Sequence, residues 1–516
     1  MSSEADGSLA AFKRLLDHAS SDAEELAPVT FTEALVGGTR ANVLRRCAIP
    51  HEFNCEMLRV LEPSLTAEEA SRCYDRFLEL SIIQVRGEVL SMHERWRKPL
   101  FKWWLRPENY AEFAEVSRRL AAYFLATDRR EDAGSEVEPT LRKHLYHLIG
   151  ADPPAGFTMF KSLCRRARRQ WRFTECAALI KLVSDYLPIL PEELKASLAY
   201  QEGKLASDLR DWGRAEELFR GLDSNAFAPI ELRIAALTRL GHALREQGRV
   251  SEAIQILTRA ESAATGLPSA NRMSWRVLLE LGESYRDVSQ LEDAERTLLA
   301  SIEAARSSID QPDCAVIYNS LGTVYLKRRE SLLAINAFRA SLEHLEREGD
   351  LLQTGQVQNN LALAYSEQLD WQAAERAFAK SLELKRQAGD LLGQGLALQN
   401  LSRVQTAQDK VDEGIASVKE AIAIFTELKD ARRAGVAKHT LGKLLRNLGD
   451  TDGAGALFKE ASALLEASGD ADRAAAARAD LNELKHKVGL PWWAWVAVAL
   501  IPVVIVALVI AVWLAA

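Results

Sequence analysis

Residues that interrupt helices are sparse in this sequence, and this scarcity already limits the fold class. Of the 516 residues, 28 are glycine and 15 are proline, and most of these fall between stretches with helical patterning. Ala, Leu, Glu and Arg dominate instead, and these residues have high helix propensity. The composition therefore predicts an all-α protein. A chain of this length is also too long for one compact core, so several structural units are expected.

The sequence also lacks the short motifs that carry catalysis, nucleotide binding or zinc binding. It contains no HExxH, GxSxG, GxxxxGK[ST] or CxxC pattern. His144 and His147 lie three residues apart, but no cysteine or clear carboxylate accompanies them, so structural histidines are favoured over a metal site. We therefore expect no enzymatic activity, no cofactor and no metal. The cysteines show no zinc-ligand spacing and fit a reducing compartment; they are Cys47, Cys55, Cys73, Cys164, Cys176 and Cys314.

An excess of basic residues is absent from the chain as a whole, which has a net charge of −7 and a pI of about 5.9. Nothing global therefore indicates nucleic-acid binding. One local run, RRARRQWR (165–172), is basic and suits contact with anionic lipid or nucleic acid. The favoured interpretation is a solvated helix face with Trp171 in the core. Residues 1–18 lack the apolar run of a secretory signal.

Long hydrophobic runs are also rare, with one exception at the C-terminal end. No charged residue occurs from Trp492 to Ala516, and a helix of that length would span ~37 Å, against a bilayer core of ~30 Å. We predict a single transmembrane helix over 491–516, an arrangement that resembles tail-anchored proteins. Basic residues precede this segment, so residues 1–490 are expected in the cytoplasm. Tryptophans near both ends suit the two membrane interfaces; they are Trp492, Trp493, Trp495 and Trp513.

The strongest internal signal is a repeat with a period of 40 residues. A leucine followed by a small residue recurs at 281–282, 321–322, 361–362, 401–402 and 441–442. One column of mostly small residues contains Ala294, Ala334, Ala374, Gly414 and Ala454, and a second contains Ser301, Ser341, Ser381, Ala421 and Ala461. The last column contains Asp310, Asp350, Asp390, Asp430 and Asp470. A period of this size indicates a solenoid of stacked repeats.

These columns have a physical interpretation. Small residues let two antiparallel helices approach closely, while bulky neighbours such as Tyr325 and Phe338 fill the space around the contact. Each aspartate is placed to cap the next first helix. The segment LGTVYLKRRESLLAINAFRASLEHL (321–345) resembles the tetratricopeptide repeat (TPR), and the long period resembles the variety found in G-protein-signalling scaffolds and kinesin light chains. The resemblance implies a right-handed solenoid of antiparallel helix pairs, with seven or eight repeats over 161–485.

The TPR resemblance further implies a groove, lined by the first helix of each repeat, that binds a peptide or partner protein. Asn360 and Asn400 stand where family members hydrogen-bond a ligand backbone, and an amide suits this role because it both donates and accepts. The alternative is that such residues are ordinary solvated polar groups. Gly414 makes the 401–421 repeat the least regular and a candidate flexible point. The groove candidates are Arg276, Glu280, Glu283, Arg286, Asn319, Lys327, Asn359, Asn360, Asn400, Arg403, His439, Lys443, Arg446 and Asn447.

The region before the repeats has a different pattern. Thr66 and Glu69 form a capping box at the start of a helix over 66–81. The apolar segments 82–85 and 88–92 flank Arg86-Gly87 and predict a hairpin, after which a helix is expected over 93–104. Helices followed by a hairpin are typical of a winged helix.

Residues 39–104 resemble the winged-helix domain that follows the nucleotide-binding module of STAND-type (NB-ARC-like) ATPases. Ser91-Met92-His93-Glu94 matches the apolar-Met-His-Asp motif of that family, with Glu in place of Asp, and in the family this histidine senses nucleotide. The nucleotide-binding module itself is missing, so His93 has no nucleotide of its own to contact. DNA binding is disfavoured because the helix over 66–81 carries more acidic than basic residues.

Five segments are therefore predicted: a weakly ordered N-terminus (1–30), a winged-helix-like domain (31–105), a helical connector (106–160), TPR repeats (161–485) and a transmembrane helix (491–516). The predicted function is that of a membrane-tethered scaffold that concentrates a partner protein at the membrane. A sensor or regulator that works with a separate ATPase or effector is the alternative, and a membrane-bound DNA-binding regulator is a further one. Self-association of the repeat array also stays open.

Overall fold

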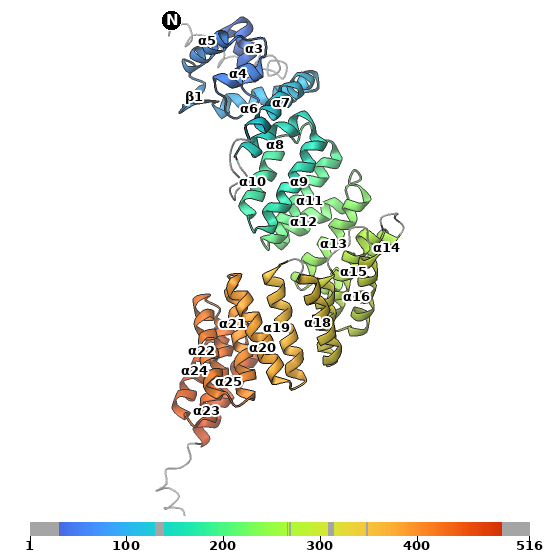
Figure 1. Ribbon diagram of the computed structural model, residues 1–516, viewed down its shortest axis with the longest axis vertical. Helices are drawn as coiled ribbons and strands as arrows, with labels where there is room; N and C mark the ends of the chain where they lie inside the picture. The colour runs from blue at the N-terminus through green and yellow to red at the C-terminus, as the bar shows by residue number, and fades with distance from the viewer. Residues whose placement is uncertain are drawn as a thin grey trace, which may run out of the picture. The chain divides into compact units, whose positions relative to one another are not determined.

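The computed structural model describes residues 30–128, 139–265, 267, 270–307, 314–346 and 349–487, and the structural statements below concern these residues. Helices make up most of them, as the composition predicts, together with one two-stranded hairpin (Figure 1). The chain divides into two compact units, Met1–Gly266 (unit 1) and Leu267–Ala516 (unit 2), and each is described by itself.

The N-terminal part of unit 1 contains helices and a hairpin in the order that the sequence predicts. The strands pair antiparallel from Ile83 with Met92 to Arg86 with Val89, and Gly87 makes the turn with a φ of 63°. Phe53 forms a further antiparallel bridge with Leu90 through two hydrogen bonds of 2.8 Å. The winged-helix interpretation of this segment stays a prediction. The elements are α3 (Gly38–Arg46), α4 (Cys55–Leu61), α5 (Ala67–Leu78), β1 (Ile83–Arg86), β2 (Val89–Met92) and α6 (Glu94–Trp104).

The predicted capping box at the start of α5 is confirmed. The hydroxyl of Thr66 accepts a hydrogen bond from the backbone N–H of Glu69 at 3.3 Å, and the Glu69 carboxylate accepts one from the backbone N–H of Thr66 at 2.9 Å. Both backbone donors would otherwise lack a partner at the helix end, which is why this pattern starts a helix.

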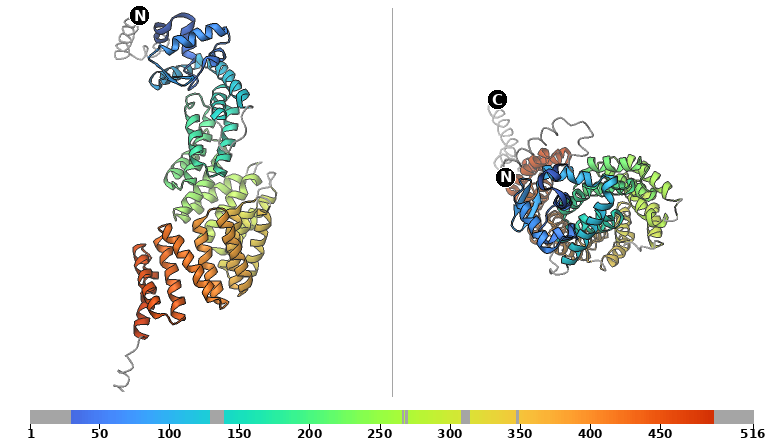
Figure 2. Two further views of the ribbon diagram at one scale, coloured as in Figure 1. Left: turned by 60° about the vertical axis from the view of Figure 1, so that its left-hand side comes forward. Right: turned by 90° about the horizontal axis from the view of Figure 1, so that it is seen from above.

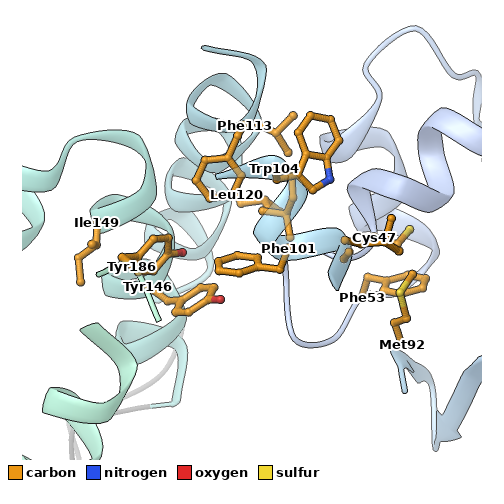
Figure 3. Close-up of a cluster of buried hydrophobic side chains, with 14 of the residues drawn as sticks. Cys47, Phe53, Met92, Phe101, Trp104, Phe113, Leu120, Tyr146, Ile149 and Tyr186 are labelled. Atoms are coloured by element: carbon orange, nitrogen blue, oxygen red, sulfur yellow. The ribbon is translucent and has the colours of Figure 1, made fainter. Parts of the chain in front are cut away.

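The remainder of unit 1 is a succession of helices, of which those up to residue 208 share one continuous core with the hairpin segment. The core extends from Phe31 to Leu205. Phe101 of α6 lies 5.8 Å from Phe113 and 5.7 Å from Tyr186 between ring centroids, and Figure 3 shows Tyr146 and Tyr186 reaching toward it. The segment boundaries predicted at 105 and 160 therefore do not separate independent cores. The helices are α7 (Pro107–Asp128), α8 (Pro139–Ala151), α9 (Pro153–Arg169), α10 (Phe173–Ser184), α11 (Glu192–Asp208), α12 (Trp212–Asp223), α13 (Ile230–Glu246) and α14 (Val250–Thr265).

Unit 2 consists of helix pairs that follow one another side by side in sequence order (Figure 1; Figure 2). The first helices α19, α21, α23 and α25 begin at residues 351, 391, 431 and 471, which reproduces the 40-residue period. The predicted solenoid-like arrangement of helix pairs is confirmed. The helices are α15 (Ala270–Asp287), α16 (Leu291–Arg306), α17 (Ala315–Lys327), α18 (Ser331–Leu345), α19 (Leu351–Glu367), α20 (Trp371–Gln387), α21 (Leu391–Ala407), α22 (Val411–Glu427), α23 (Ala431–Asn447), α24 (Thr451–Ala467) and α25 (Ala471–Lys487).

The small residues of the repeat mark close contacts within each helix pair, as predicted. A β-carbon at Gly322 would lie 2.5 Å from Cε1 of Phe338, and one at Gly442 would lie 2.6 Å from the same atom of Phe458. Real carbon atoms do not approach so closely, so the bare backbone of the first helix is needed for the ring of the second helix to pack against it.

The serine column adds a hydrogen bond to the same contact. The hydroxyl of Ser341 donates to the carbonyl of Ala315 at 2.7 Å, and that of Ser381 donates to the carbonyl of Gly355 at 2.7 Å. Ser301 makes the equivalent bond to the carbonyl of Trp275 at 2.6 Å. Each bond links the second helix to the start of the first helix in the same repeat.

The aspartate column caps the first helices, as predicted. Asp350, Asp390 and Asp430 each accept a hydrogen bond from the backbone N–H three residues later, at 3.0, 2.8 and 2.9 Å. Asp470 makes the same contact at 3.4 Å. Asp310 lies outside the described residues.

Two expectations from the sequence are corrected. Trp171 is not in the core: it is 69% exposed and sits at the turn between α9 and α10 with a φ of 58°. The aromatic contribution to the core comes instead from Phe157 and Phe160, which are buried on α9. The apolar character of Trp171 suggested burial, but the left-handed turn conformation points its side chain outward.

The second correction concerns the predicted C-terminal transmembrane helix, which was expected to hold the bulk of the chain in the cytoplasm. In the described part of the chain, no helix is both long enough and apolar enough to cross a bilayer. The segment 491–516, on which the prediction relied, lies outside the described residues. The predicted membrane anchor and membrane localisation are therefore not supported.

One buried residue departs from the repeat. Equivalent core positions at 40-residue steps hold Ala305, Leu345, Phe425 and Leu465, and the fifth member of this column is Lys385, which is 2% exposed. The ammonium group donates to the carbonyl of Gly393 at 3.4 Å. Burial lowers the pKa of Lys385, an effect that nearby Asp390 partly offsets. A charge therefore occupies a position that elsewhere holds a hydrocarbon side chain.

We predict that Gly322→Ala destabilises the protein by about 1–3 kcal/mol, because the added methyl group meets the buried ring of Phe338. Gly455→Ala on α24 is the matched control, since its nearest neighbour would lie at 3.7 Å and alanine favours a helix. Urea unfolding of the two variants checks the prediction. Equal stability of the two variants would contradict the close-contact role of the small column.

We predict that Lys385→Met stabilises the protein by about 1–3 kcal/mol at pH 7, because it removes a buried charge. The pKa of Lys385 in the folded state is below its unfolded value of about 10.4, so the wild type gains stability as the pH rises. The advantage of the variant should therefore shrink between pH 7 and about pH 9.5. Urea midpoints measured at both pH values test this, with Lys419→Met on the exposed face of α22 as the control. A pH-independent difference would argue against a charge effect.

Candidate functional site

Polar side chains on successive first helices of unit 2 are joined by hydrogen bonds. The amide of Asn360 on α19 donates to Oδ1 of Asn319 on α17 at 2.9 Å. The amide of Asn400 on α21 donates to Oδ1 of Asn359 on α19 at 3.4 Å. His439 on α23 lies 2.7 Å from Asp480 on α25 through Nε2. These three pairs, each 41 residues apart, are called the inter-repeat ladder below.

The ladder changes the interpretation of the predicted amides. Asn359 and Asn360 are both only 8% exposed. Oδ1 of Asn360 also accepts a hydrogen bond from Gln356 at 3.3 Å, so its amide is used on both sides. These asparagines hold neighbouring first helices in register, whereas the sequence resemblance assigned them to ligand binding.

The predicted residues on α15 and α17 are also connected to each other. Glu283 accepts a hydrogen bond from Ser320 at 2.6 Å. Arg286 lies 3.4 Å from the hydroxyl of Thr323, and Lys327 donates to the backbone carbonyl of Arg286 at 3.0 Å. Two further predicted residues, Arg276 and Glu280, lie on α15, where Arg276 packs 4.8 Å from the ring centroid of Trp275.

Charged side chains of the first helix α23 gather around Asp480 of the first helix α25. Arg446 lies 2.8 Å and Lys443 lies 3.5 Å from its carboxylate, on which His439 also converges. Burial favours a higher pKa for Asp480, but the hydrogen bonds from His439 and Arg446 outweigh it and lower the pKa. Burial lowers the pKa of His439, although its bond to Asp480 acts in the opposite direction. The structure thus brings these three predicted residues together around one carboxylate.

Two predicted residues are left exposed without such ties. In the part of the chain that the structure describes, neither Arg403 on α21 nor Asn447 on α23 has a side-chain hydrogen bond or ion pair. Lys327 and Lys443 are exposed as well. These side chains are exposed, whereas Asn359 and Asn360 are buried.

The ladder is interrupted at one junction. The residues equivalent to a ladder pair between α21 and α23 are Gln399 and Thr440, and among the described residues no hydrogen bond joins them. Thr440 donates instead to the carbonyl of Val436 in its own helix at 3.1 Å. In the repeat formed by α21 and α22, Ser402 donates to the carbonyl of Gly414 at 2.6 Å. A hydrogen bond therefore joins the two helices of this least regular repeat.

Sequence reasoning missed three participants: Ser320, Gln356 and Asp480. Asp480 follows Asn400 by two periods of the repeat and therefore stands in the same column. Continuing that column beyond the last complete helix pair would have identified it. Ser320 precedes Asn360 by one period and stands in that column as well. Gln356 carries no comparable signal, because its role depends on which rotamers meet across the junction.

We predict that Asn319 and Asn360 are energetically coupled by about 0.5–1.5 kcal/mol, as expected for a neutral hydrogen bond. Urea unfolding of Asn319→Ala, Asn360→Ala and the double variant gives this coupling directly. Gln399→Ala with Thr440→Ala serves as the control cycle, for which the effects should simply add. Additive effects in both cycles would show that the ladder bond contributes nothing to stability.

Comparison with known proteins identifies the repeats. Residues 236–268 match one family described as tetratricopeptide repeat, and residues 274–347, 313–387 and 353–427 match another of the same description. The chain therefore contains tetratricopeptide repeats. No curated protein matches it.

Several solved structures are similar to the chain. One is a Signal Transduction ATPase with Numerous Domains (STAND) protein with a tetratricopeptide repeat sensor from Pyrococcus horikoshii, at 13% identity and a TM-score of 0.54, covering 90% of this chain and 67% of that one. Others are a Rap protein complexed with Competence and Sporulation Factor (13%, TM-score 0.44, covering 64% of this chain and 98% of that one) and BtubC from P. vanneervenii (18%, TM-score 0.38, covering 42% and 90%). The likeness to the STAND protein concerns the fold.

Proposed function

We propose that this chain is a non-enzymatic scaffold whose first-helix face in unit 2 binds a segment of a partner protein. The observation that carries the proposal is that some polar side chains on that face hydrogen-bond to one another, whereas others are exposed. The ladder asparagines are paired with each other, while Arg403 and Asn447 are exposed and have no described partner. Tetratricopeptide repeats suggest protein–protein interaction, and the exposed residues give such an interaction specific contacts.

The ladder supports binding by fixing the spacing of the first helices before a partner arrives. A preorganised surface loses less conformational freedom when it binds, and this raises affinity without new contacts. The exposed side chains of Arg403 and Lys443 have long stems and can adjust to a ligand, while the hydrogen-bonded amides of Asn359 and Asn360 keep their positions. The ligand would be an extended segment that crosses several first helices, because the exposed residues lie on different repeats.

A second candidate function is supported by the similarity to the STAND protein. The similar region covers 90% of this chain, which is a larger share than the helices from α9 to α25 make up. The similarity therefore includes part of the region before the repeats. On this reading the chain is a sensor or regulator that works with a separate ATPase, since it has no GxxxxGK[ST] motif. His93 caps α6 by accepting a hydrogen bond from the backbone N–H of Arg95 at 3.2 Å.

Direct DNA reading through α5 is not favoured. Arg72 pairs with Glu68 at 2.7 Å, and Arg76 pairs with Glu79. Both basic residues of the helix are thus engaged with carboxylates, and phosphate contact would require them to be released.

We predict that a photo-crosslinking residue at position 403 captures a partner protein in the producing cells, because Arg403 is exposed on the proposed binding face. The same crosslinker at position 376 is the control, since Arg376 is exposed on the second helix α20 and lies off that face. The crosslinked products are identified by mass spectrometry. Capture at 403 alone, reduced by Lys443→Ala and Asn447→Ala, is the expected result.

Equal capture at positions 403 and 376, or none at either position, would contradict the proposed binding face. Crosslinkers placed on α5 and β2 distinguish the second candidate, because a partner ATPase captured only there would assign the interaction to unit 1.

A further inference from the structure

Unit 1 contains a cavity of about 300 Å³ that is separate from the first-helix face. Its walls come from the loop between α3 and α4, from α7 and α8, and from α10. Pro50, His51, Phe124, Tyr146, His147 and Leu182 line it, together with Glu52, Pro139, Arg142 and Lys143. Small-molecule sites generally range from ~300 to 1,000 Å³, so this cavity suits a single-ring ligand rather than a nucleotide.

Aromatic rings give the cavity flat apolar walls. The ring of His147 stacks on Phe124, with centroids 5.6 Å apart and planes inclined by 6°. The ring of His51 meets Tyr146 edge-on with centroids 4.6 Å apart. Lys143 lies 5.6 Å from the Phe124 centroid. A planar ligand entering this space would find ring faces to contact on more than one side.

The polar groups around the cavity are unevenly satisfied. Lys143 pairs with Glu52, and His51 lies 3.9 Å from Asp185. In contrast, no described residue forms a hydrogen bond or an ion pair with the side chain of Arg142 or that of His147. The buried Nε of Arg142 and Nδ1 of His147 are among the polar atoms that lack a partner. Each of these is a single nitrogen that surrounding atoms cover, so a ligand in the cavity would meet the remaining nitrogens of the guanidinium and the imidazole, which can donate hydrogen bonds.

The electrostatics of the cavity favour an anionic ligand. Burial lowers the pKa of His51 to about 4, with a further contribution from Arg97, and burial also lowers the pKa of His147 well below its usual value. Both imidazoles are consequently uncharged at neutral pH. Arg97, which is 4% exposed, is already bonded to the hydroxyl of Tyr146 at 2.9 Å and the carbonyl of Pro50 at 3.3 Å. The charge at the cavity that lacks a counter-ion is that of Arg142.

We propose that this cavity binds a small organic carboxylate with a planar apolar body. The Arg142 guanidinium and the His147 ring donate to the carboxylate, and Phe124, Tyr146 and Leu182 contact the body of the ligand. A guanidinium suits a carboxylate because its donors form a planar fork. The inference is independent of partner binding by unit 2.

Titration of the full-length protein with benzoate, followed by calorimetry and ligand-observed NMR, tests the proposal. Benzoate should bind saturably, and Arg142→Gln should weaken binding at least tenfold through loss of the charge-assisted contact. Arg118→Gln is the matched control, because Arg118 is exposed on α7 and pairs with Glu115. Leu182→Phe, which fills the cavity without changing charge, should also weaken binding and provides a second variant if Arg142→Gln misfolds.

Three results would overturn the proposal. The first is no saturable binding of benzoate, cinnamate or nicotinate at millimolar concentration. The second is equal binding of benzyl alcohol, which would show that the carboxylate has no role. The third is competition by inorganic phosphate at the same concentration as benzoate, which would show that the site recognises charge without the apolar body.

Discussion

Unit 2 depends on a contact in which the backbone of a first helix lies directly against a ring or branched side chain of the second helix. Gly322 beneath Phe338 and Gly442 beneath Phe458 are the tightest examples. At these two glycines the contact leaves no room for a side chain, so it fixes both the distance between the helices and their axial positions. The serine bonds to the first-helix carbonyls and the aspartate caps then fall at constant positions relative to it. A single pair still leaves apolar surface exposed, so the pairs are stable only as a stack.

Stacking creates a second requirement, because polar side chains at the junctions between first helices lose contact with water. Buried polar groups need hydrogen-bond partners, and the ladder supplies them at the junctions α17–α19, α19–α21 and α23–α25. The asparagines are therefore part of the packing of the solenoid. At α21–α23 the equivalent pair, Gln399 and Thr440, makes no such bond within the described residues, so the ladder does not tie the first helices together there. This junction lies next to the exposed Arg403 and Lys443.

The sequence predicts much of the fold because the features concerned are local or periodic. The capping box at Thr66, the turn at Gly87 and the caps at Asp350, Asp390 and Asp430 depend on residues close together in the chain. The 40-residue period supplies the helix pairs. Lys385 could have been noticed as an exception in an otherwise apolar column, but its burial could not be deduced, since lysine is usually exposed.

The candidate site is less predictable, because its properties depend on contacts between repeats. Asn360 and Asn400 look the same in the sequence whether they bind a ligand or, as here, the asparagines Asn319 and Asn359 of the preceding first helices. Trp171 was misplaced for a different reason: its apolar ring suggested burial, whereas the residue occupies the exposed turn between α9 and α10. For the C-terminal segment, the absence of charge, the tryptophans at both ends and the basic flank supported the membrane interpretation, and no helix of the described chain bears it out.

Because the cavity lies within the continuous core of unit 1, ligand binding there would affect the other elements that share this core. Its walls include the loop that leads into α4, beside the hairpin segment, and α10, the second helix of the first repeat pair. A ligand that binds only the folded arrangement stabilises it in proportion to the logarithm of its concentration over its dissociation constant. Because one core joins these elements, that stabilisation would be shared by the hairpin segment and the adjoining repeat. A sensor function for unit 1 would then need no nucleotide-binding module in the same chain, because ligand occupancy alone would alter how firmly the two segments are held together.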